Sequence, residues 1–597
     1  MITPSGKAVK GIVAAGGRLL AAACALLFLQ VAASPAEKAA GSAAESQRLS
    51  SPGELELRGI VAGGRLETLQ WPQFSDYQTE IEEFYRSGGY ALAWVRNSRP
   101  TAKARVVIKR LQAADNEGLL AQDYDSPLWK ARLKELDLPG RPAAETQLLR
   151  FDLALTICAM RYTLDLRLGR INPQRFHSTF AFEPDIIGPS DFLRRRVMSA
   201  EDVAAAFSAL EPPFPSYRRL VHAVQRYKRM AGLDDGGQLP ASKVPVRPGD
   251  RYPGVPRLTR LLRLLGDLPP RAVVGQKLYD GPLVKAVKNF QRRHGLPPDG
   301  LLGELTLRQL NTPLALRLQQ LRLTLERWRW LPHRFTSPPI LVNIPEFRLY
   351  AGNEPSQKVV VGMAFEHETP IFMSQLTEVV FRPPWTVPTS IQRSELVPKL
   401  EKDPAYLEKN GFEVIDGRDA LVSSGTVSAA VLGQLKEGTL YLRQRPGPGN
   451  SLGLVKFLMP NSHSVYIHGA PSRRGFMGSE RDLSHGCIRV EHPEALAAWV
   501  LRDRPEWTRE RIRTAMSGTE TVIVKLADPI TVLIQYGTAA VGENGEVRFF
   551  DDIYSRDAAE AEAFDKRART AALPAPHAAD VHVDEIRSGV VTHTSAP

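Results

Sequence analysis

Apolar residues recur three and four positions apart between about residues 71 and 245, which is the spacing of one helix face. Stretches such as "FDLALTICAMRYTLDL" and "YRRLVHAVQRYKRMAG" lie between Gly and Pro residues, which end helices. The pattern predicts a helical domain over 71–245. It contains no evident constellation of acids, bases or metal ligands, so we expect a scaffold role.

A second helical unit is expected over 255–312. Its three helices are predicted at about 257–265, 282–294 and 303–311, around the turn "LPPDG", where Pro and Gly supply the turn geometry. The stretch "LRLTLERWRWLP" then predicts an amphipathic connecting helix within 313–336.

From about residue 337 the pattern changes to short β-branched or aromatic runs, such as "PPILVNIPEFRLYAG" and "ETVIVKL", separated by turn residues. This predicts a β-rich domain over 337–555. Residues 394–436 interrupt the strand rhythm and form either an inserted lid over a cleft or an ordinary connection. Apolar periodicity is lost from about 556, so we expect a flexible tail over 556–597.

The N-terminal residues 1–33 have the layout of a secretory signal, in which basic residues precede an apolar run that ends in small residues. The run has about 15 apolar residues, fewer than the roughly 20 that a membrane span needs. Cleavage is expected, and retention as an N-terminal anchor is the alternative. Residues 34–70 begin with Ala, Ser, Glu and Gly and are expected to form a flexible tether.

Composition narrows the class of protein. A chain of 597 residues is too long for one hydrophobic core, since cores stop growing near ~250 to 300 residues. The 77 Lys and Arg against 65 Asp and Glu give a net charge of +12, which favours polyanionic surroundings such as a membrane surface, nucleic acid or acidic glycan. No basic block with interleaved aromatic residues is present, so we expect no nucleic-acid binding.

Two cysteines remain once the signal is removed. Cys158 lies in an apolar helical pattern, where a free cysteine usually behaves as a small buried hydrophobe. Cys487 instead follows His485 and Gly486 in a polar stretch, where no packing argument requires a thiol. Cys487 is therefore the candidate for chemistry.

The stretch "VYIHGAPSRRGFMGSERDLSHGCIRV" contains the parts that a cysteine nucleophile needs: a thiolate, a base and donors for an oxyanion. His468 ends a predicted strand and could accept the proton of Cys487, which lies on the next strand after a loop. Gly486 allows close approach of the backbone. The amides of His485, Gly486 and Cys487 could form the oxyanion hole.

The same residues allow two other interpretations, a zinc site and an ordinary polar surface. A zinc site could use His463, His468, His485 and Cys487, but neither a carboxylate general base nor a fixed ligand spacing is evident. The histidines could also be ordinary polar residues on a β surface. We expect no metal and no cofactor.

The pattern "HG…SHGCIRV" resembles the signature of the L,D-transpeptidases with a YkuD-type catalytic domain. The strings "RQRPGPGNSLGLVKFLMPN", "RPPWTVPTSIQRSELVPK", "LERWRWLP" and "DDIYSRD" are similar to the large, YcbB-like subfamily. "FQRRHGLPPDG" resembles the three-helix peptidoglycan-binding module, for which a generic three-helix bundle is the alternative. Many short members have Asn two residues after the cysteine, where this chain has Arg489.

The resemblance implies a multidomain α+β fold with a helical scaffold domain, a peptidoglycan-binding-like domain and a β-rich catalytic domain with an inserted lid. It also implies a mechanism. Cys487 attacks the carbonyl of the third residue of a stem tetrapeptide, expels the terminal D-alanine and forms a thioester, with His468 as the base. Ser484 and His485 orient the loop and the imidazole, and the amides of Gly486 and Cys487 hold the oxyanion. A side-chain amine of a second stem then forms a 3-3 cross-link.

Four further residues are candidate substrate contacts: Arg489, Tyr466, Trp385 and Asn450. Trp385 could instead belong to the core, and Arg489 could instead pair with Glu491. The family also implies that carbapenems acylate Cys487.

Two alternative functions stay open. The thioester could be discharged by water or another amine, which gives an L,D-carboxypeptidase or a hydrolase. The chain could also be a non-catalytic wall-binding scaffold, although the presence of both His468 and Cys487 argues against it. The expected partners are peptidoglycan stem peptides and glycan, with other cell-wall synthesis enzymes. The expected location is the periplasm, with the inner membrane involved only if residues 1–33 are retained.

Overall fold

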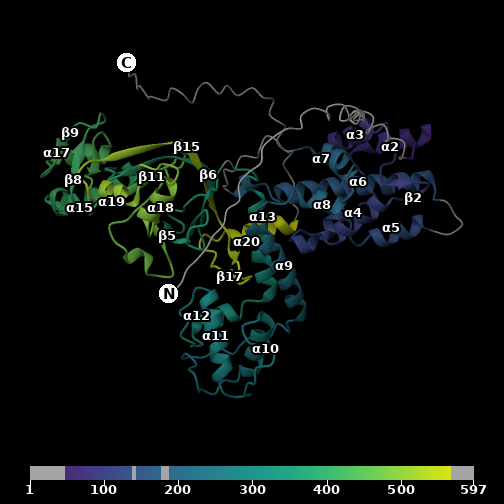
Figure 1. Cartoon of the computed structure of the whole chain (residues 1–597), viewed down its shortest axis with the longest axis horizontal. Coiled ribbons are helices and arrows are strands. Elements are labelled where there is room, and N and C mark those ends of the chain that lie inside the picture. Colours follow the sequence, from purple (N-terminus) through teal and green to yellow (C-terminus); the bar gives the residue numbers. More distant parts are fainter. Residues whose placement is uncertain (1–46, 138–142, 177–186, 336, 567–597) are drawn as a thin grey trace, which may run out of the picture.

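The computed structural model describes residues 47–137, 143–176, 187–335 and 337–566. Figure 1 shows helices α2 to α8 at one end of the molecule, the β-rich part at the other and α10 to α12 below, with α13 where the three parts meet. The predicted signal or anchor of 1–33 lies outside the described residues. Among the helices that are described, none has the length and apolar character needed to cross a membrane.

The scaffold part is helical and is centred on α6, which is buried on nearly all sides. Its helices are α2 (Ser51–Gly63), α3 (Gln78–Ser87), α4 (Ala102–Gln112), α5 (Trp129–Leu136), α6 (Glu145–Leu168), α7 (Pro189–Phe192) and α8 (Val203–Ser208), with a small hairpin of β1 (Val95–Arg96) and β2 (Arg99–Pro100). Cys158 lies in α6 and is fully buried, which confirms its prediction as a core residue.

The tether expected over 34–70 is wrong from residue 51 onward. Helix α2 begins there, with the hydroxyl of Ser50 accepting a hydrogen bond from the amide of Gly53 at the helix start. Leu57 and Val61 are buried in the scaffold core. Two apolar residues one turn apart are enough to hold this helix, because α3 and α6 supply the other side of the contact.

The second unit contains α10 (Val255–Leu265), α11 (Gly281–Arg293) and α12 (Glu304–Leu310), close to the predicted helices. Its turn is closed by the buried Gln291, whose amide nitrogen donates to Asp299 Oδ1 at 2.8 Å and whose amide oxygen accepts from the amide of Gly300 at 2.8 Å. Gly300 has φ +78°, a conformation that favours glycine.

Helix α13 (Leu314–Arg329) connects this unit to the β-rich part, but it is not the amphipathic helix that was predicted. It is buried on several sides, and its charged residues each meet a different part of the molecule. Arg317 donates to the carbonyl of Gln309 in α12 at 3.2 Å. Glu326 accepts from the amide of Ile171, after α6, at 2.7 Å.

Helix α20 (Arg556–Lys566) also packs on α13, so the flexible tail expected over 556–597 is wrong for its first eleven residues. The guanidinium of Arg327 forms ion pairs with Glu560 at 2.8 Å and Asp557 at 2.7 Å. Helix α9 (Pro215–Leu233), predicted within the scaffold, packs on α13 and joins the core of the β-rich part instead.

The β-rich part is a sheet that closes on itself. Its order is β13-β5-β14-β12-β11-β6-β15-β3-β4, with a further pairing of β4 to β5. The strands are β3 (Ile340–Asn343), β4 (Arg348–Ala351), β5 (Gln357–Gly362), β6 (Phe372–Phe381), β11 (Val455–Leu458), β12 (Ile467–His468), β13 (Asp482–Ser484), β14 (Ile488–Val490) and β15 (Val522–Gln535). Beside it lie α18 (Pro493–Val500), α19 (Arg509–Ser517) and a ribbon of β16 (Ala539–Val541) and β17 (Val547–Phe549). One apolar core fills the closed sheet.

The interruption predicted over 394–436 is a separate unit that is larger than expected and spans 385–444. It contains β7 (Trp385–Thr386), α14 (Thr389–Ile391), α15 (Val397–Lys402), α16 (Tyr406–Lys409), β8 (Phe412–Ile415), β9 (Leu421–Ser423), α17 (Ala429–Glu437) and β10 (Tyr441–Gln444). Its four strands form their own sheet, in the order β7-β10-β8-β9, over their own apolar core. An ordinary connection would have no core, so we call residues 385–444 the inserted unit.

Removal of the carboxylate of Glu560 by Glu560→Gln is expected to lower the free energy of unfolding. Breaking a buried ion pair costs ~3 to 5 kcal/mol, and we expect about 2 to 3 kcal/mol here because Asp557 still faces Arg327. Urea unfolding followed by tryptophan fluorescence measures the change.

The matched control is Glu562→Gln in the same helix. Glu562 pairs with Lys566 on the surface, where water and salt screen an ion pair and its contribution to stability is small. Equal effects of the two substitutions would show that the Arg327 cluster does not hold α20 in place.

Candidate active site

The register of β12 and β14 determines which side chains share a face of the sheet. The two strands run parallel, with Ile467 beside Ile488 and His468 beside Arg489. Both isoleucines are fully buried in the core. Because side chains alternate along a strand, the residues next to them face the other side. Those residues are Tyr466, His468, Cys487 and Arg489.

A lysine that the sequence analysis missed completes this face. Lys456 in β11 pairs directly with His468, so Lys456, His468 and Arg489 form a row across three strands. The ammonium of Lys456 lies 4.1 Å from the centroid of the Tyr466 ring. The alternation of "LVKFL", with Val455 and Phe457 buried, is the signal that could have placed Lys456 on the polar face.

The imidazole of His468 is buried between two cations. Burial, followed by the positive charges of Arg489 and Lys456, lowers the pKa of His468 to about 3. The ring is therefore neutral at neutral pH. Backbone hydrogen bonds at Gly469 and Leu452 act on the pKa of the ring in the opposite direction. A neutral imidazole can accept a proton at its unprotonated nitrogen.

The thiol of Cys487 is half-buried, and its hydrogen bond goes to the carbonyl of Ser464 at 3.7 Å rather than to His468. Burial raises the pKa of the thiol, and the opposing influences are hydrogen bonds from Tyr466 and the charges of Lys456 and Arg489. The resting pair is thus a thiol and a neutral imidazole on one face, without a preformed ion pair.

The loop before Cys487 is held by Ser484, which is buried. Its Oγ donates to the carbonyl of Cys487 at 2.6 Å and accepts from the amide of Gly486 at 3.3 Å. The hydroxyl of Thr369 donates to the carbonyl of Gly486 at 2.8 Å, and Gly486 has φ +103°, where other residues are strained. The predicted oxyanion donor at Gly486 is therefore engaged with Ser484 in this structure.

His485 faces the inserted unit. Its Nε2 atom lies 2.5 Å from Oε1 of Glu395 in the turn Gln392–Leu396, and its ring centroid lies 4.6 Å from that of His367. Neither Glu395 nor His367 was predicted, because nothing in the sequence indicates contacts of His485 with residues 90 and 118 positions earlier in the chain. The contact joins the inserted unit to the cysteine loop.

The structure separates the four candidate substrate contacts. Tyr466 is beside the thiol. Trp385 is half-buried, hydrogen-bonds the phenol of Tyr466 and lies against the core of the inserted unit. Asn450 is only 1 % exposed and does not belong to the site. Its amide donates to the carbonyls of Gln444 and Arg445 at 3.2 and 3.0 Å, so it shapes a turn.

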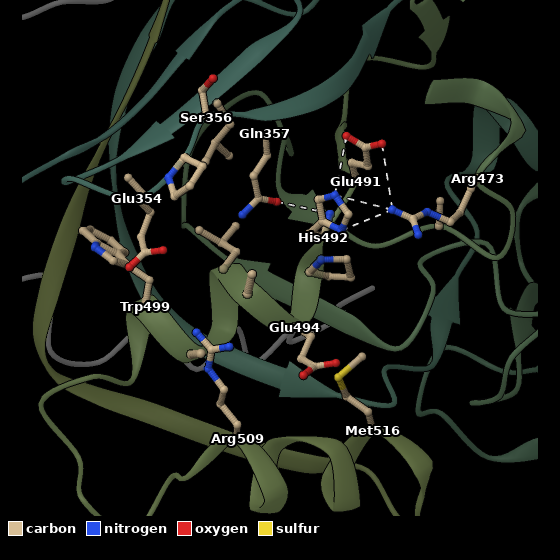
Figure 2. Close-up of a pocket in the computed structure, with 18 residues that line it drawn as sticks. Glu354, Ser356, Gln357, Arg473, Glu491, His492, Glu494, Trp499, Arg509 and Met516 are labelled. Atoms are coloured by element: carbon tan, nitrogen blue, oxygen red, sulfur yellow. Dashed lines mark hydrogen bonds and ion pairs between the residues drawn. The ribbon is translucent and has the colours of Figure 1, made fainter. Parts of the chain in front are cut away.

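Arg489 does not pair with Glu491, the partner considered from the sequence. Glu491 instead lies 3.9 Å from both Lys358 and Arg473. Glu491 and Arg473 line a cavity of about 670 Å³ at the far end of β14, which Figure 2 shows. Arg473 also contacts the ring of His492 there, at 3.2 Å. Neither Cys487 nor His468 is among the described residues that line this cavity.

No group of three or more His, Cys, Asp or Glu side chains in the described ranges is arranged to hold a metal ion. The chemistry that the described side chains of the site offer is that of a thiol, a neutral imidazole and two cations.

Comparison with known proteins assigns families to three parts of the chain. Residues 79–224 match a scaffold domain, residues 251–310 a "Putative peptidoglycan binding domain" and residues 338–524 an L,D-transpeptidase catalytic domain. These matches confirm the predicted sequence of helical scaffold, peptidoglycan-binding-like and β-rich catalytic domains.

A curated relative is a "Putative L,D-transpeptidase" of Haemophilus influenzae, 31% identical over 244 residues. The match covers 40% of this chain and 48% of the relative, so the chain spans about half the length of that protein. A crystal structure of an L,D-transpeptidase from Xylanimonas cellulosilytica is 14% identical and covers 49% of this chain and 99% of its own, with a TM-score of 0.15, which is too low to support an inference.

The raised pKa of the Cys487 thiol predicts a simple pH dependence of its alkylation. The rate with iodoacetamide is expected to rise with pH through the range near ~8.5 in which a free cysteine titrates and to keep rising above it. No step is expected near pH ~6.5, the ordinary pKa of histidine, because His468 stays neutral down to about pH 3.

Intact-mass measurement of the alkylated fraction over time gives the rate at each pH. Cys487→Ala protein is the control for any labelling of the buried Cys158. A fast plateau beginning near pH 6 to 7 would instead indicate a preformed thiolate and imidazolium.

Proposed function

The chain carries an L,D-transpeptidase catalytic domain over residues 338–524 and a peptidoglycan-binding domain over residues 251–310, and we propose from this that it cross-links peptidoglycan stem peptides. The proposed product is the 3-3 cross-link, formed through a thioester on Cys487. The observation that carries the proposal is that Cys487 and the neutral His468 share one face of the sheet, with the loop between them held by Ser484.

In the first step, Sγ of Cys487 attacks the carbonyl carbon of the third residue of the donor stem. His468 accepts the thiol proton, so the nucleophile carries the negative charge only as the bond forms. The amide bond to the terminal D-alanine then breaks, and His468 returns the proton to the departing amine. The enzyme is left as a thioester, and D-alanine leaves with its free amine.

The oxyanion of this step needs donors close to Sγ. The backbone amide of Cys487 is one, and the amide of Gly486 becomes a second when its long 3.3 Å hydrogen bond to Ser484 gives way. Ser484 keeps its bond to the carbonyl of Cys487, which fixes the direction of the loop. Tyr466 lies next to the thiol and Trp385 hydrogen-bonds Tyr466, and both are proposed to contact the donor.

In the second step, a side-chain amine of another stem attacks the thioester carbon. His468 takes a proton from the attacking amine, the carbon–sulfur bond breaks, and the proton passes to the thiolate. The enzyme is regenerated and an amide cross-link remains. Discharge by water would give a carboxypeptidase or hydrolase by the same chemistry.

The setting of the reaction follows from its substrate. We place it in the periplasm, with residues 1–33 as the export signal or anchor, and with glycan strands and other cell-wall synthesis enzymes as partners. The inserted unit, which meets the cysteine loop through Glu395 and His485, is proposed to act as a lid over the bound donor. A lid of this kind is consistent with the YcbB-like subfamily.

Purified disaccharide-tetrapeptide is expected to give a cross-linked dimer with loss of one alanine in the presence of the mature protein. Mass spectrometry of the products detects it. Cys487→Ala should abolish the dimer while leaving the fold intact, which circular dichroism checks.

A trimmed monomer without dimer would favour the carboxypeptidase or hydrolase over the transpeptidase. Dimer formation by Cys487→Ala well above background would overturn the assignment of the nucleophile.

A carbapenem is expected to acylate Cys487, because its strained ring is an acyl donor for the same thiol. Intact-mass spectrometry should show one adduct per chain in the wild-type protein and none in Cys487→Ala. An adduct that persists in the variant would place the reactive group elsewhere.

A further inference from the structure

Two cations of the site have no acidic partner. Neither Lys456 nor Arg489 forms an ion pair with any residue of the described ranges, and Nε of Arg489 is buried without a hydrogen-bond partner. Both are half-buried, and burial is the main cause that lowers the pKa of each. A buried cation without a partner loses its hydration and gains nothing in return.

Several buried guanidinium groups elsewhere in the molecule are paired with carboxylates. Arg293 lies 2.7 Å from Asp267, Arg327 lies 2.8 Å from Glu560, and Arg329 lies 3.3 Å from Glu326. At the cavity of Figure 2 the exposed Arg473 also has an acidic neighbour, Glu491. Arg317 and Arg481 are buried without an ion pair in the described ranges, but their guanidinium groups donate to backbone carbonyls. Arg489 differs from both groups, because its buried Nε has no hydrogen-bond partner among the described residues.

The geometry directs both cations toward the same space. Lys456 and Arg489 lie on either side of His468 in one row across the sheet. The ammonium of Lys456 leans over the ring of Tyr466, and the phenol of Tyr466 contacts the thiol. The charges of both cations act on Cys487. An anion above the row would therefore meet two positive charges beside the reacting sulfur.

The charged groups around this row are few. Glu378 on β6 is an acid whose charge acts on Lys456, but the two do not form an ion pair in the described structure. Tyr466 shares the strand of His468, and Trp385 approaches Tyr466 from the inserted unit. No described carboxylate is paired with the row. The Cys487 thiolate is the nearby protein anion that favours the charged form of both cations, and a thiol does not carry that charge. While Cys487 is a thiol, a bound anion would supply the missing negative charge.

On the basis of the proposed function, from which the ligand is taken, we infer that Lys456 and Arg489 together bind a carboxylate of the donor peptide. Two carboxylates are available next to the scissile amide. One is the C-terminal carboxylate of the leaving amino acid, and the other is a side-chain carboxylate on the third residue. Lys456 is then a specificity-determining residue that the sequence did not reveal.

Binding of the carboxylate also affects the base. Burial is the largest cause of the low pKa of His468, and the two cations lower it further, so an anion between them would weaken their field and raise the pKa of the ring. Donor binding would therefore make His468 a stronger base at the moment when the thiol has to lose its proton. A donor without the carboxylate would leave the pKa of His468 as it is in the free protein.

Binding to Cys487→Ala protein tests the carboxylate site without turnover. Isothermal titration calorimetry compares three tetrapeptides: the free acid, the same peptide as a C-terminal amide, and the same peptide with the side-chain carboxylate of its third residue amidated. We expect one amide to bind at least ~10-fold more weakly than the free acid, as for loss of a charge-assisted hydrogen bond. The amide that fails identifies which carboxylate is bound.

Substitutions of Lys456 in Cys487→Ala protein test whether this lysine causes the difference in affinity between the free acid and the amide. Lys456→Met should weaken the free acid about as much as the amidation does, and should abolish the difference between acid and amide. Lys456→Arg keeps the charge and should keep the preference. The matched control is Lys358→Met, which removes a lysine of the same sheet that already pairs with Glu491.

Equal affinity for the acid and both amides would overturn the carboxylate site while leaving the proposed function in place. Failure of every tetrapeptide to bind, together with no cross-linking by the wild type, would overturn both. The comparison of the three tetrapeptides needs no Lys456 variant. It therefore tests the carboxylate site even if Lys456→Met does not fold.

Discussion

The parallel pairing of β12 with β14 is the constraint on which the site depends. Ile467 and Ile488 are fully buried side by side, and their burial fixes the register of the two strands. A slip of one residue would turn His468 into the core and an isoleucine toward the thiol face, because side chains alternate with a period of two. Apolar packing inside the closed sheet therefore determines which polar groups meet outside it.

The same constraint reaches Lys456 through β11, whose Val455 and Phe457 are buried in the same core. Three strands within residues 455–490 thus present one cation, one imidazole and a second cation in a row. The loop that precedes β14 needs only local bonds from Ser484 to place the thiol beside this row. Rigid strands supply the precision, and the short loop supplies the thiol that is proposed as the nucleophile.

Helix α13 has a corresponding role at the scale of the whole molecule. Its charged residues contact α12, the end of α6 and α20, so that one helix joins the binding module, the scaffold and the catalytic sheet. The module is held further by Arg293, which donates to the carbonyl of Val547 at 3.3 Å, and by His294, which stacks near Phe549. A peptidoglycan strand bound to the module would therefore lie in a defined position relative to the catalytic sheet.

The parts of this architecture that could be predicted are those with strong local signals. The helical and β-rich regions follow from the period of apolar residues, and the three helices around "LPPDG" follow from turn chemistry. Cys487 and His468 stood out because a polar, glycine-containing stretch gives a thiol no packing role. The parts that were missed depend on partners far away in the chain. Helix α2 is held by α3 and α6, and Arg327 of α13 is buried where Glu560, more than 200 residues away, meets it.

Helix α13 and the thiol face both contain buried charges, which patterns of neighbouring residues in the sequence do not predict. The two places differ in how the buried charges are neutralised. In α13, a charge in the interior is stable because an opposite charge of the same chain meets it, as Glu560 meets Arg327. At the thiol face, Lys456 and Arg489 are desolvated without such a partner, which lowers the stability of the free protein. Proteins retain such local violations mainly at functional sites. The uncompensated charge beside Cys487 is therefore better understood as a property of the free enzyme that the bound donor completes than as a defect of the fold.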